Sequence, residues 1–216
     1  ATLWSRSASA NSSTDEGYIQ LGNSTIVSTS GGAITLAGSS STDGTTSLPN
    51  GYALSNTAAQ GGIHLATSNG TSNANVQLLS GGGDINIRGK STGAGSWGIV
   101  AYAGFKMDSG TGRIIMDGYQ TSTGNGIDLE ATSTILSSIS SAAPAAASPA
   151  IYLLGKCDST STASVGQRGL YFTTAGLTIS STGTGGGITL SGDNAAVHTT
   201  NPGSIYMPGL DVLSSS

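Results

Sequence analysis

The amino-acid sequence predicts an all-β protein, a solenoid in which short strands stack as successive coils around an apolar core. Three observations predict it. Glycine, serine and threonine dominate the composition, with 34, 36 and 27 of the 216 residues. Apolar residues still make up 36% of the chain and recur in short ordered groups, unlike those of a disordered linker. The best helix candidate, residues 140–150, is rich in alanine but contains Pro144 and Pro149, which break helical hydrogen bonding.

The strands are predicted from a repeated pattern of glycine followed by an apolar–any–apolar triplet. Such a triplet has period two, which puts its apolar side chains on one face and its middle residue toward solvent. Ile34 and Leu36 are thus expected to point inward and Thr35 outward, and residues 188–190 follow the same rule. The pattern occurs at residues 17–21, 31–36, 61–65, 81–87, 112–116, 126–129, 169–172, 176–179, 185–190, 203–207 and 209–212.

These strands are too short to form a core in pairs. Burying two inward side chains stabilises by about 2–3 kcal/mol each, whereas ordering the backbone costs about 1–2 kcal/mol per residue. The strands must therefore stack, so that each inward residue lies between equivalents above and below. Triplets start at 63, 76 and 85, and again at 105, 114 and 127. We interpret this spacing as roughly 20 residues per coil, about ten irregular coils and a rod about 50 Å long.

The connections between strands are predicted from turn-forming residues. Asn-Gly and Asp-Gly pairs favour the positive φ angles of tight turns. Three polar or proline-containing stretches are expected to be loop insertions that make the period irregular. The pairs lie at residues 43–44, 50–51, 69–70 and 117–118, and the insertions at 39–50, 140–150 and 156–168. Residues 1–216 are expected to form one solenoid domain, interpreted as an excerpt of a longer repeat protein. No secretion signal is recognised in the first ten residues of this sequence.

Charge and cysteine content exclude several classes of protein. The net charge is −4, and seven Lys and Arg residues are scattered along the chain, so no basic stripe for nucleic acid is expected. The sequence contains no run of about 18 apolar residues, so no membrane-spanning helix is predicted. Charged residues make up only 8% of the chain, which argues against acid–base catalysis. The single cysteine excludes an internal disulfide framework.

Histidine and cysteine offer no predicted site. His64 is the middle residue of its triplet and His198 is expected in a polar loop, so both are expected at the surface. Neither has further ligands at zinc-site spacing. Cys157 lies between Lys156 and Asp158, which suggests a loop, and it is interpreted as a structural or incidental thiol. No catalytic residue, no cofactor and no metal are expected.

Acidic residues near the triplets raise an alternative. Carboxylates stacked on successive coils could form a cleft for acid–base chemistry or calcium. Their irregular spacing favours solvated outward charges, which also discourage pairing between strand edges. The calcium-binding glycine-rich nonapeptide is absent, because Asp84 occupies the wrong place in residues 81–89. The other acidic residues in question are Asp117, Asp128, Glu130 and Asp211.

Threonine and tyrosine suggest two further surfaces. Thr-x-Thr pairs at 121–123, 132–134, 160–162 and 182–184 could order water for ice binding, but their unequal intervals favour polar turns. Aromatic side chains could line a carbohydrate groove, although isolated ones more often stack on a neighbouring coil. Tyr152 and Tyr206, as middle residues of their triplets, are expected to be exposed.

Several segments resemble the repeats of filamentous haemagglutinin-type exoproteins, the adhesins of two-partner secretion in Gram-negative bacteria. The resemblance implies a right-handed parallel β-helix, secretion or display on the outer surface of a Gram-negative bacterium, and a role in adhesion, aggregation or biofilm. The segments are GGAITLAG (31–38), GGIHLATS (61–68), GGGDINIRG (81–89), GNGIDLEATS (124–133) and GGGITLSGD (185–193).

The leading functional hypothesis is therefore a non-enzymatic shaft segment of a surface adhesin or extracellular filament. Its expected partners are other copies of itself, neighbouring solenoid segments and surface glycans, without nucleic acid and without membrane insertion. Low charge would favour lateral association of such rods. The alternative is a carbohydrate-binding or carbohydrate-cleaving β-helix of the polysaccharide lyase or phage tailspike type. An ice-binding solenoid is a third hypothesis.

Overall fold

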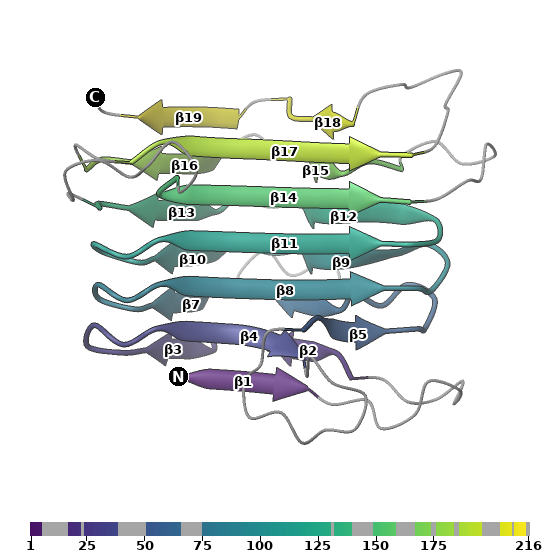
Figure 1. The fold of residues 1–216 in the computed structure, drawn as a ribbon, viewed down its shortest axis with the longest axis horizontal. Coiled ribbons are helices and arrows are strands. Elements are labelled where there is room, and N and C mark those ends of the chain that lie inside the picture. Colours follow the sequence, from purple (N-terminus) through teal and green to yellow (C-terminus); the bar gives the residue numbers. More distant parts are fainter. Residues whose placement is uncertain are drawn as a thin grey trace.

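The protein is a parallel β-solenoid, which confirms the predicted fold class (Figure 1). The computed structural model describes residues 1–5, 17–22, 24–38, 51–65, 75–130, 132–139, 149–158, 167–173, 176–183, 186–195, 204–208 and 210–214. Within these ranges the chain forms nineteen strands and no helix. Consequently these ranges contain no helix of the length and apolarity needed to cross a membrane.

Three parallel sheets run along the rod, here called A, B and C. Sheet A contains β1 (Thr2–Ser5), β4 (Ile34–Gly38), β5 (Ala53–Ser55), β8 (Ile85–Ser91), β11 (Ile114–Gln120), β14 (Ile151–Cys157) and β17 (Ile188–Asn194). Sheet B contains β2 (Ile19–Leu21), β6 (Ile63–Leu65), β9 (Ser96–Ala101), β12 (Gly124–Leu129), β15 (Leu170–Phe172) and β18 (Ile205–Tyr206). Sheet C contains β3 (Ile26–Ser28), β7 (Val76–Leu79), β10 (Phe105–Asp108), β13 (Thr134–Ser137), β16 (Leu177–Ser181) and β19 (Leu210–Ser214).

Each coil passes through the three sheets in the order A, B, C. In Figure 1 the strands of sheet A run from left to right in front, those of sheet C return behind, and successive coils climb from the N-terminus to the C-terminus. This sense of winding is right-handed, the hand that parallel crossovers favour. All eleven segments predicted from the glycine-led triplet contain a strand.

The predicted number of coils was wrong, because the described residues form six coils rather than about ten. A coil has three strands, and several of them, such as β3 and β13, lack the glycine-led pattern. Ile114 pairs with Ile85, 29 residues earlier, and the next two coils add 37 residues each. Six coils at the spacing of paired strands give a rod about 30 Å long instead of about 50 Å.

The core consists of columns of equivalent residues, one per coil. The register pairs the first inward residue of each long sheet A strand with the same position above and below, and the second inward residue likewise. Ile34 and Leu36 are buried while Thr35 is only partly so, as predicted. At the last sheet A strand Ile188 and Leu190 are partly buried and Thr189 is exposed. The two columns are Ile34, Ile85, Ile114, Ile151, Ile188 and Leu36, Ile87, Met116, Leu153, Leu190.

A glycine seam joins sheets A and B. In sheet A, Gly118 pairs with Gly89 on one side and Gly155 on the other. A Cβ built on Gly118 would lie 2.3 Å from the carbonyl oxygen of Gly126 in sheet B. On Gly155 it would lie 2.0 Å from the carbonyl oxygen of Gly169. The two backbones therefore touch along the rod, and the core lies to one side of this contact.

The seam corrects one predicted turn. Asp117 and Gly118 lie within β11, and the structure shows no positive φ at either residue. Glycine is needed there for close approach of two backbones and not for turn geometry. The pairs at residues 43–44 and 69–70 lie outside the described residues, as do 39–50 and 140–148 of the predicted insertions.

A column of buried polar side chains follows the seam at the corner between sheets A and B. Register places Ser91, Gln120 and Cys157 one above another. All three are buried, and Cys157 is the last residue of β14, so its predicted loop position was wrong. Its thiol donates to the carbonyl oxygen of Gly124 at 3.3 Å. This contact agrees with the interpretation of Cys157 as a structural thiol.

Gln120 holds this corner closed. Its Nε2 donates to the carbonyl oxygen of Ser96 at 2.7 Å and to the Ser96 hydroxyl at 2.8 Å, and its Oε1 accepts the N–H of Ser122 at 2.8 Å. Replacing Gln120 by Ala would leave these buried groups without their partner. We expect a loss of about 2–3 kcal/mol in the free energy of unfolding, measured by urea denaturation. The control is Gln20→Ala, which removes an exposed glutamine from β2; equal losses would contradict the prediction.

The corner between sheets C and A uses a hydroxyl and glycine. The Ser109 hydroxyl donates to the carbonyl oxygen of Gly112 at 2.7 Å. The Ser80 hydroxyl makes the equivalent bond to Gly83 one coil earlier. Gly110, with φ +57°, adopts the left-handed conformation that this turn requires. A hydroxyl residue followed three positions later by glycine therefore marks the corners at Thr29, Ser80 and Ser109.

Candidate functional site

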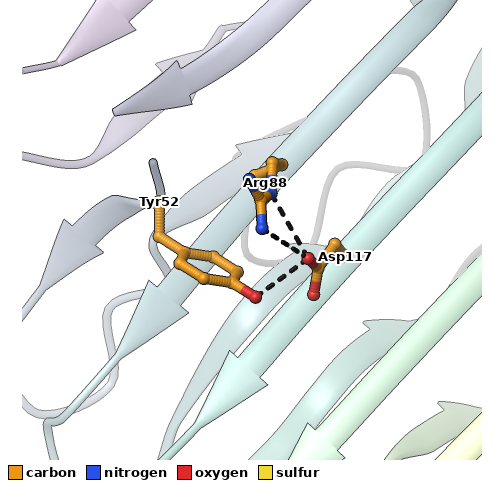
Figure 2. Close-up of polar contacts among 3 residues, drawn as sticks. All are labelled: Tyr52, Arg88 and Asp117. Atoms are coloured by element: carbon orange, nitrogen blue, oxygen red, sulfur yellow. Dashed lines mark hydrogen bonds and ion pairs between the residues drawn. The ribbon is translucent and has the colours of Figure 1, made fainter. Parts of the chain in front are cut away.

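Charged and aromatic side chains gather on the outer face of sheet A. Figure 2 shows Tyr52, Arg88 and Asp117 converging from three neighbouring segments. The Tyr52 hydroxyl donates to Asp117 Oδ2 at 2.8 Å, and Arg88 Nη2 donates to the same oxygen at 3.1 Å. The guanidinium also lies over the Tyr52 ring, 4.6 Å from its centroid. Burial, followed by the bond to Asp117, raises the pKa of Tyr52.

A second network surrounds Tyr119 on the same face. The ammonium groups of Lys90 and Lys156 lie 4.6 and 5.1 Å from the centroid of its ring. Register places these lysines one coil before and one coil after Tyr119. The Tyr119 hydroxyl donates to Asp158, which lowers the pKa of Asp158 and raises that of Tyr119 to about 12. With cations seated against these rings, the sheet A face braces one coil against the next.

The bracing role of Tyr52 can be measured. Tyr52→Phe removes the hydroxyl that Asp117 accepts but keeps the ring beneath Arg88. We expect a loss of about 1 kcal/mol in the free energy of unfolding, the net contribution of one such hydrogen bond. In an Asp117→Asn background the same substitution should cost less, because part of the interaction is already gone. Strict additivity of the two substitutions would show that the network is not coupled.

On the outer face of sheet B, His64 is not at the surface, contrary to the sequence prediction. It is only 6% exposed, and its ring lies 6.3 Å from those of both Tyr18 and Tyr102. Its Nε2 accepts the backbone N–H of Gly61. Burial lowers the pKa of His64 to about 4, so the ring is neutral at physiological pH.

Asp128 also departs from the prediction of a solvated outward charge. It is 1% exposed, and its Oδ2 accepts a hydrogen bond from Asn125 at 2.7 Å. Within the described part of the chain its Oδ1 has no hydrogen-bond partner. Burial raises the pKa of Asp128 to about 7, and burial also raises that of Glu130. The structure thus brings two of the predicted acidic residues to one face.

Aromatic rings flank this carboxylate pair. Trp97 meets Tyr102 edge to face, with ring centroids 5.3 Å apart. Tyr171 stacks on Tyr206 at the same separation, and the Arg168 guanidinium lies 4.9 and 4.5 Å from their centroids. We call this set the sheet B cluster: Trp97, Tyr102, Asn125, Asp128, Glu130, Arg168, Tyr171 and Tyr206.

A shallow groove of about 420 Å³ begins where sheet B turns into sheet C. It crosses the first residues of β7, β10 and β13, on three successive coils. Tyr102 and Glu130 of the sheet B cluster precede two of its lining residues, Gly104 and Thr132, by two positions each. The lining residues are Asn75, Val76, Gln77, Gly104, Phe105, Lys106, Thr132 and Thr134.

The remaining acidic candidates do not join the cluster. Asp84 accepts the backbone N–H of Arg113 at 2.8 Å, at the corner before sheet A. Asp117 belongs to the sheet A network, and the side chain of Asp211 and all of His198 lie outside the described residues. Among the side chains that the structure does describe, no three His, Cys, Asp or Glu residues gather closely enough to hold a metal ion.

The tyrosine and threonine predictions have mixed outcomes. Tyr206 is 42% exposed, as expected, whereas Tyr152 is partly buried on the outer face of β14. Residues 121–123 lie between β11 and β12, and residues 132–134 lead into β13 at a different corner. These two Thr-x-Thr pairs therefore form no common array. All of residues 160–162, and Thr184 of the pair at 182–184, lie outside the described residues.

Sequence reasoning missed the groove and the ring contacts because their residues come from different coils. The signal that could have located them is a seven-residue pattern in sheet A: isoleucine, apolar at the third position, glycine at the fifth and polar at the seventh. It starts at Ile85, Ile114 and Ile188, and at Ile151 with cysteine at the seventh position. Aligning the chain on this pattern would have placed Tyr102 and Glu130 at the same corner. No protein-family model, curated protein or solved structure matches this chain.

Proposed function

We propose that this chain is a stiff, non-enzymatic shaft segment of a secreted or surface-displayed bacterial adhesin or extracellular filament. One observation carries the proposal: six coils repeat the same inward columns along the described chain, with the sheets hydrogen-bonded from first coil to last. Such a ladder makes a rigid spacer whose outer faces can carry many weak contacts. The sheet A network and the glycine seam support the same role, because both fasten neighbouring coils and sheets.

The ends of the rod support end-to-end continuation. All four large hydrophobic residues that are well exposed in the described structure lie on the first or the last coil. Ile26 in β3 is 61% exposed, while Val212 and Leu213 in β19 are 47% and 57% exposed. Tyr206 in β18 is the fourth. A further coil, whether from the same chain or from a second copy, would cover these side chains and pair the open strand edges.

The test is self-association of the purified chain. We expect its mass in light scattering to rise with concentration and electron micrographs to show rods in multiples of one length. Leu213→Lys should reduce both effects, since it places a charge on the open edge. Thr92→Lys, which alters an exposed residue just after β8 on an inner coil, is the control. A chain that stays monomeric at high concentration would overturn end-to-end continuation.

The second candidate function is carbohydrate binding, and the sheet B cluster favours it. Aromatic rings beside carboxyl and amide groups are a combination that suits sugar rings and their hydroxyls. Asp128 and Glu130 also leave open a carbohydrate-cleaving β-helix. Screening uronate-rich and lipopolysaccharide-type glycans for cleavage separates these possibilities: released fragments that disappear in Asp128→Asn and Glu130→Gln would support an enzyme, and no fragments would support binding alone.

A further inference from the structure

The groove at the start of sheet C has the shape and chemistry of a site for an extended polar molecule. Its outer column consists of Gln77, Lys106 and Thr134, which register places on three successive coils. Neighbouring strands are about 4.8 Å apart, so these side chains form a ladder of hydrogen-bonding groups parallel to the rod axis. Amide groups both donate and accept, and hydroxyls do the same, which matches the hydroxyls of a sugar.

Glycine opens the groove at its centre. A Cβ built on Gly104 would lie 2.8 Å from the carbonyl oxygen of Thr132. Because Gly104 carries no side chain, the backbone of the next coil stays accessible between Asn75 and Thr134, which line the same groove. The floor is apolar, with Val76 and Phe105 turned into the core.

The corner end of the groove leads to the sheet B cluster. Tyr102 and Glu130 lie two residues before Gly104 and Thr132. A ligand that extends past the corner therefore meets a tyrosine ring and a carboxyl group. Burial, followed by the nearby carboxyl groups of Asp128 and Glu130, raises the pKa of Tyr102.

The charges around the groove favour an uncharged ligand. Lys106 is the one cation among the residues that line the groove, and it pairs with Asp108 at 3.2 Å. Beyond the corner the Glu130 carboxyl group is accompanied by the Arg168 guanidinium, and burial raises the pKa of Asp128 to about 7. Because Asp108 offsets the charge of Lys106, the lining residues carry no surplus positive charge to attract an acidic glycan or a phosphate.

We propose that this groove binds an uncharged oligosaccharide laid along the rod axis, with Gln77, Lys106 and Thr134 hydrogen-bonding its hydroxyls and Tyr102 contacting a sugar ring at the corner. The inference rests on the carbohydrate-binding candidate and is independent of the shaft role. It assigns no cleavage step.

The experiment is isothermal titration of the full chain with neutral hexasaccharides of glucose, mannose and N-acetylglucosamine, and with hexagalacturonate as the acidic comparison. We expect at least one neutral hexasaccharide to bind more tightly than hexagalacturonate. Gln77→Ala and Thr134→Val should each weaken binding about fivefold, the effect of one lost hydrogen bond. Gln20→Ala and Thr189→Val, which remove the same side chains elsewhere on the surface, should leave it unchanged.

Two outcomes would overturn this inference. If hexagalacturonate binds and the neutral sugars do not, carbohydrate binding stands but the ligand class is wrong. If a neutral sugar binds equally well to Gln77→Ala and Thr134→Val, the site lies elsewhere. Absence of binding by every glycan removes the carbohydrate candidate and this inference together, while the self-association test still decides the shaft role.

Discussion

Replacing Gly155 by Ala is expected to lower the free energy of unfolding by more than about 3 kcal/mol. The added carbon would lie 2.0 Å from the carbonyl oxygen of Gly169, which is backbone and cannot rotate away. This clash can be relieved only if sheets A and B move apart. Because Gly155 pairs with Gly118 and Gly192, the displacement would spread to both neighbouring coils.

The matched control for this prediction is Gly187→Ala. Gly187 precedes β17, and a Cβ there meets no atom within 4 Å. Urea denaturation followed by circular dichroism compares the two variants with the parent chain. Gly187→Ala should change the free energy of unfolding by less than about 1 kcal/mol. If the two variants are equally stable, sheets A and B are not in backbone contact along the seam.

Replacing Asp128 by Asn is expected to stabilise the protein at pH 8 by about 2–4 kcal/mol and to leave its stability unchanged at pH 3. The pKa of Asp128 is raised from 3.8 to about 7 by burial. The unfolded chain therefore loses this proton near pH 4, whereas the folded chain keeps it until about pH 7. The free energy of unfolding therefore falls as the pH rises through that window. Above the window the full cost of burying the ionised carboxylate remains. Asparagine keeps the shape and the acceptor for Asn125 without the charge.

The measurement is thermal unfolding of both proteins between pH 3 and 8. The difference between them isolates Asp128, because His64 titrates in both. His64 has the opposite slope: its lowered pKa means that stability is lost as the pH falls from about 6.5 to about 4. Asp193→Asn, which alters an exposed residue of β17, serves as the control. A constant difference between Asp128→Asn and the parent chain at all pH values would contradict the prediction.

The glycine-led triplets were sufficient to predict the fold class and eleven strands, because alternation of apolar residues dictates which face of a strand is buried. They were insufficient for the coil. β7 follows Asn75 and β13 follows Ser133, so neither has the leading glycine that marks other strands. The spacing of the triplets was interpreted as two strands per coil and roughly 20 residues, whereas a coil has three strands and one described coil has 29 residues.

The site was harder to predict for a different reason. The alternation of apolar residues along each strand correctly predicts that His64 and Asp128 point away from the core, yet both are buried. Side chains from other strands cover them: Tyr18 lies against His64, and register puts Val100 and Tyr171 on either side of Asp128. Contacts of this kind depend on register between coils, and a loop insertion of unknown length erases register from the sequence. Cys157 illustrates the same limit, since its polar neighbours resemble a loop while its strand position places it inside.

The winding of the chain has a mechanical consequence. Ile85 and Ile114 are neighbours across the ladder, about 4.8 Å apart, but 29 residues of chain connect them. Pulled straight, that segment would span about 100 Å. Tension applied to an end strand acts on one coil's hydrogen bonds at a time, so the rod would unwind coil by coil and lengthen roughly twentyfold where it yields. A rod built this way keeps its length without load and extends coil by coil under a sudden force instead of breaking.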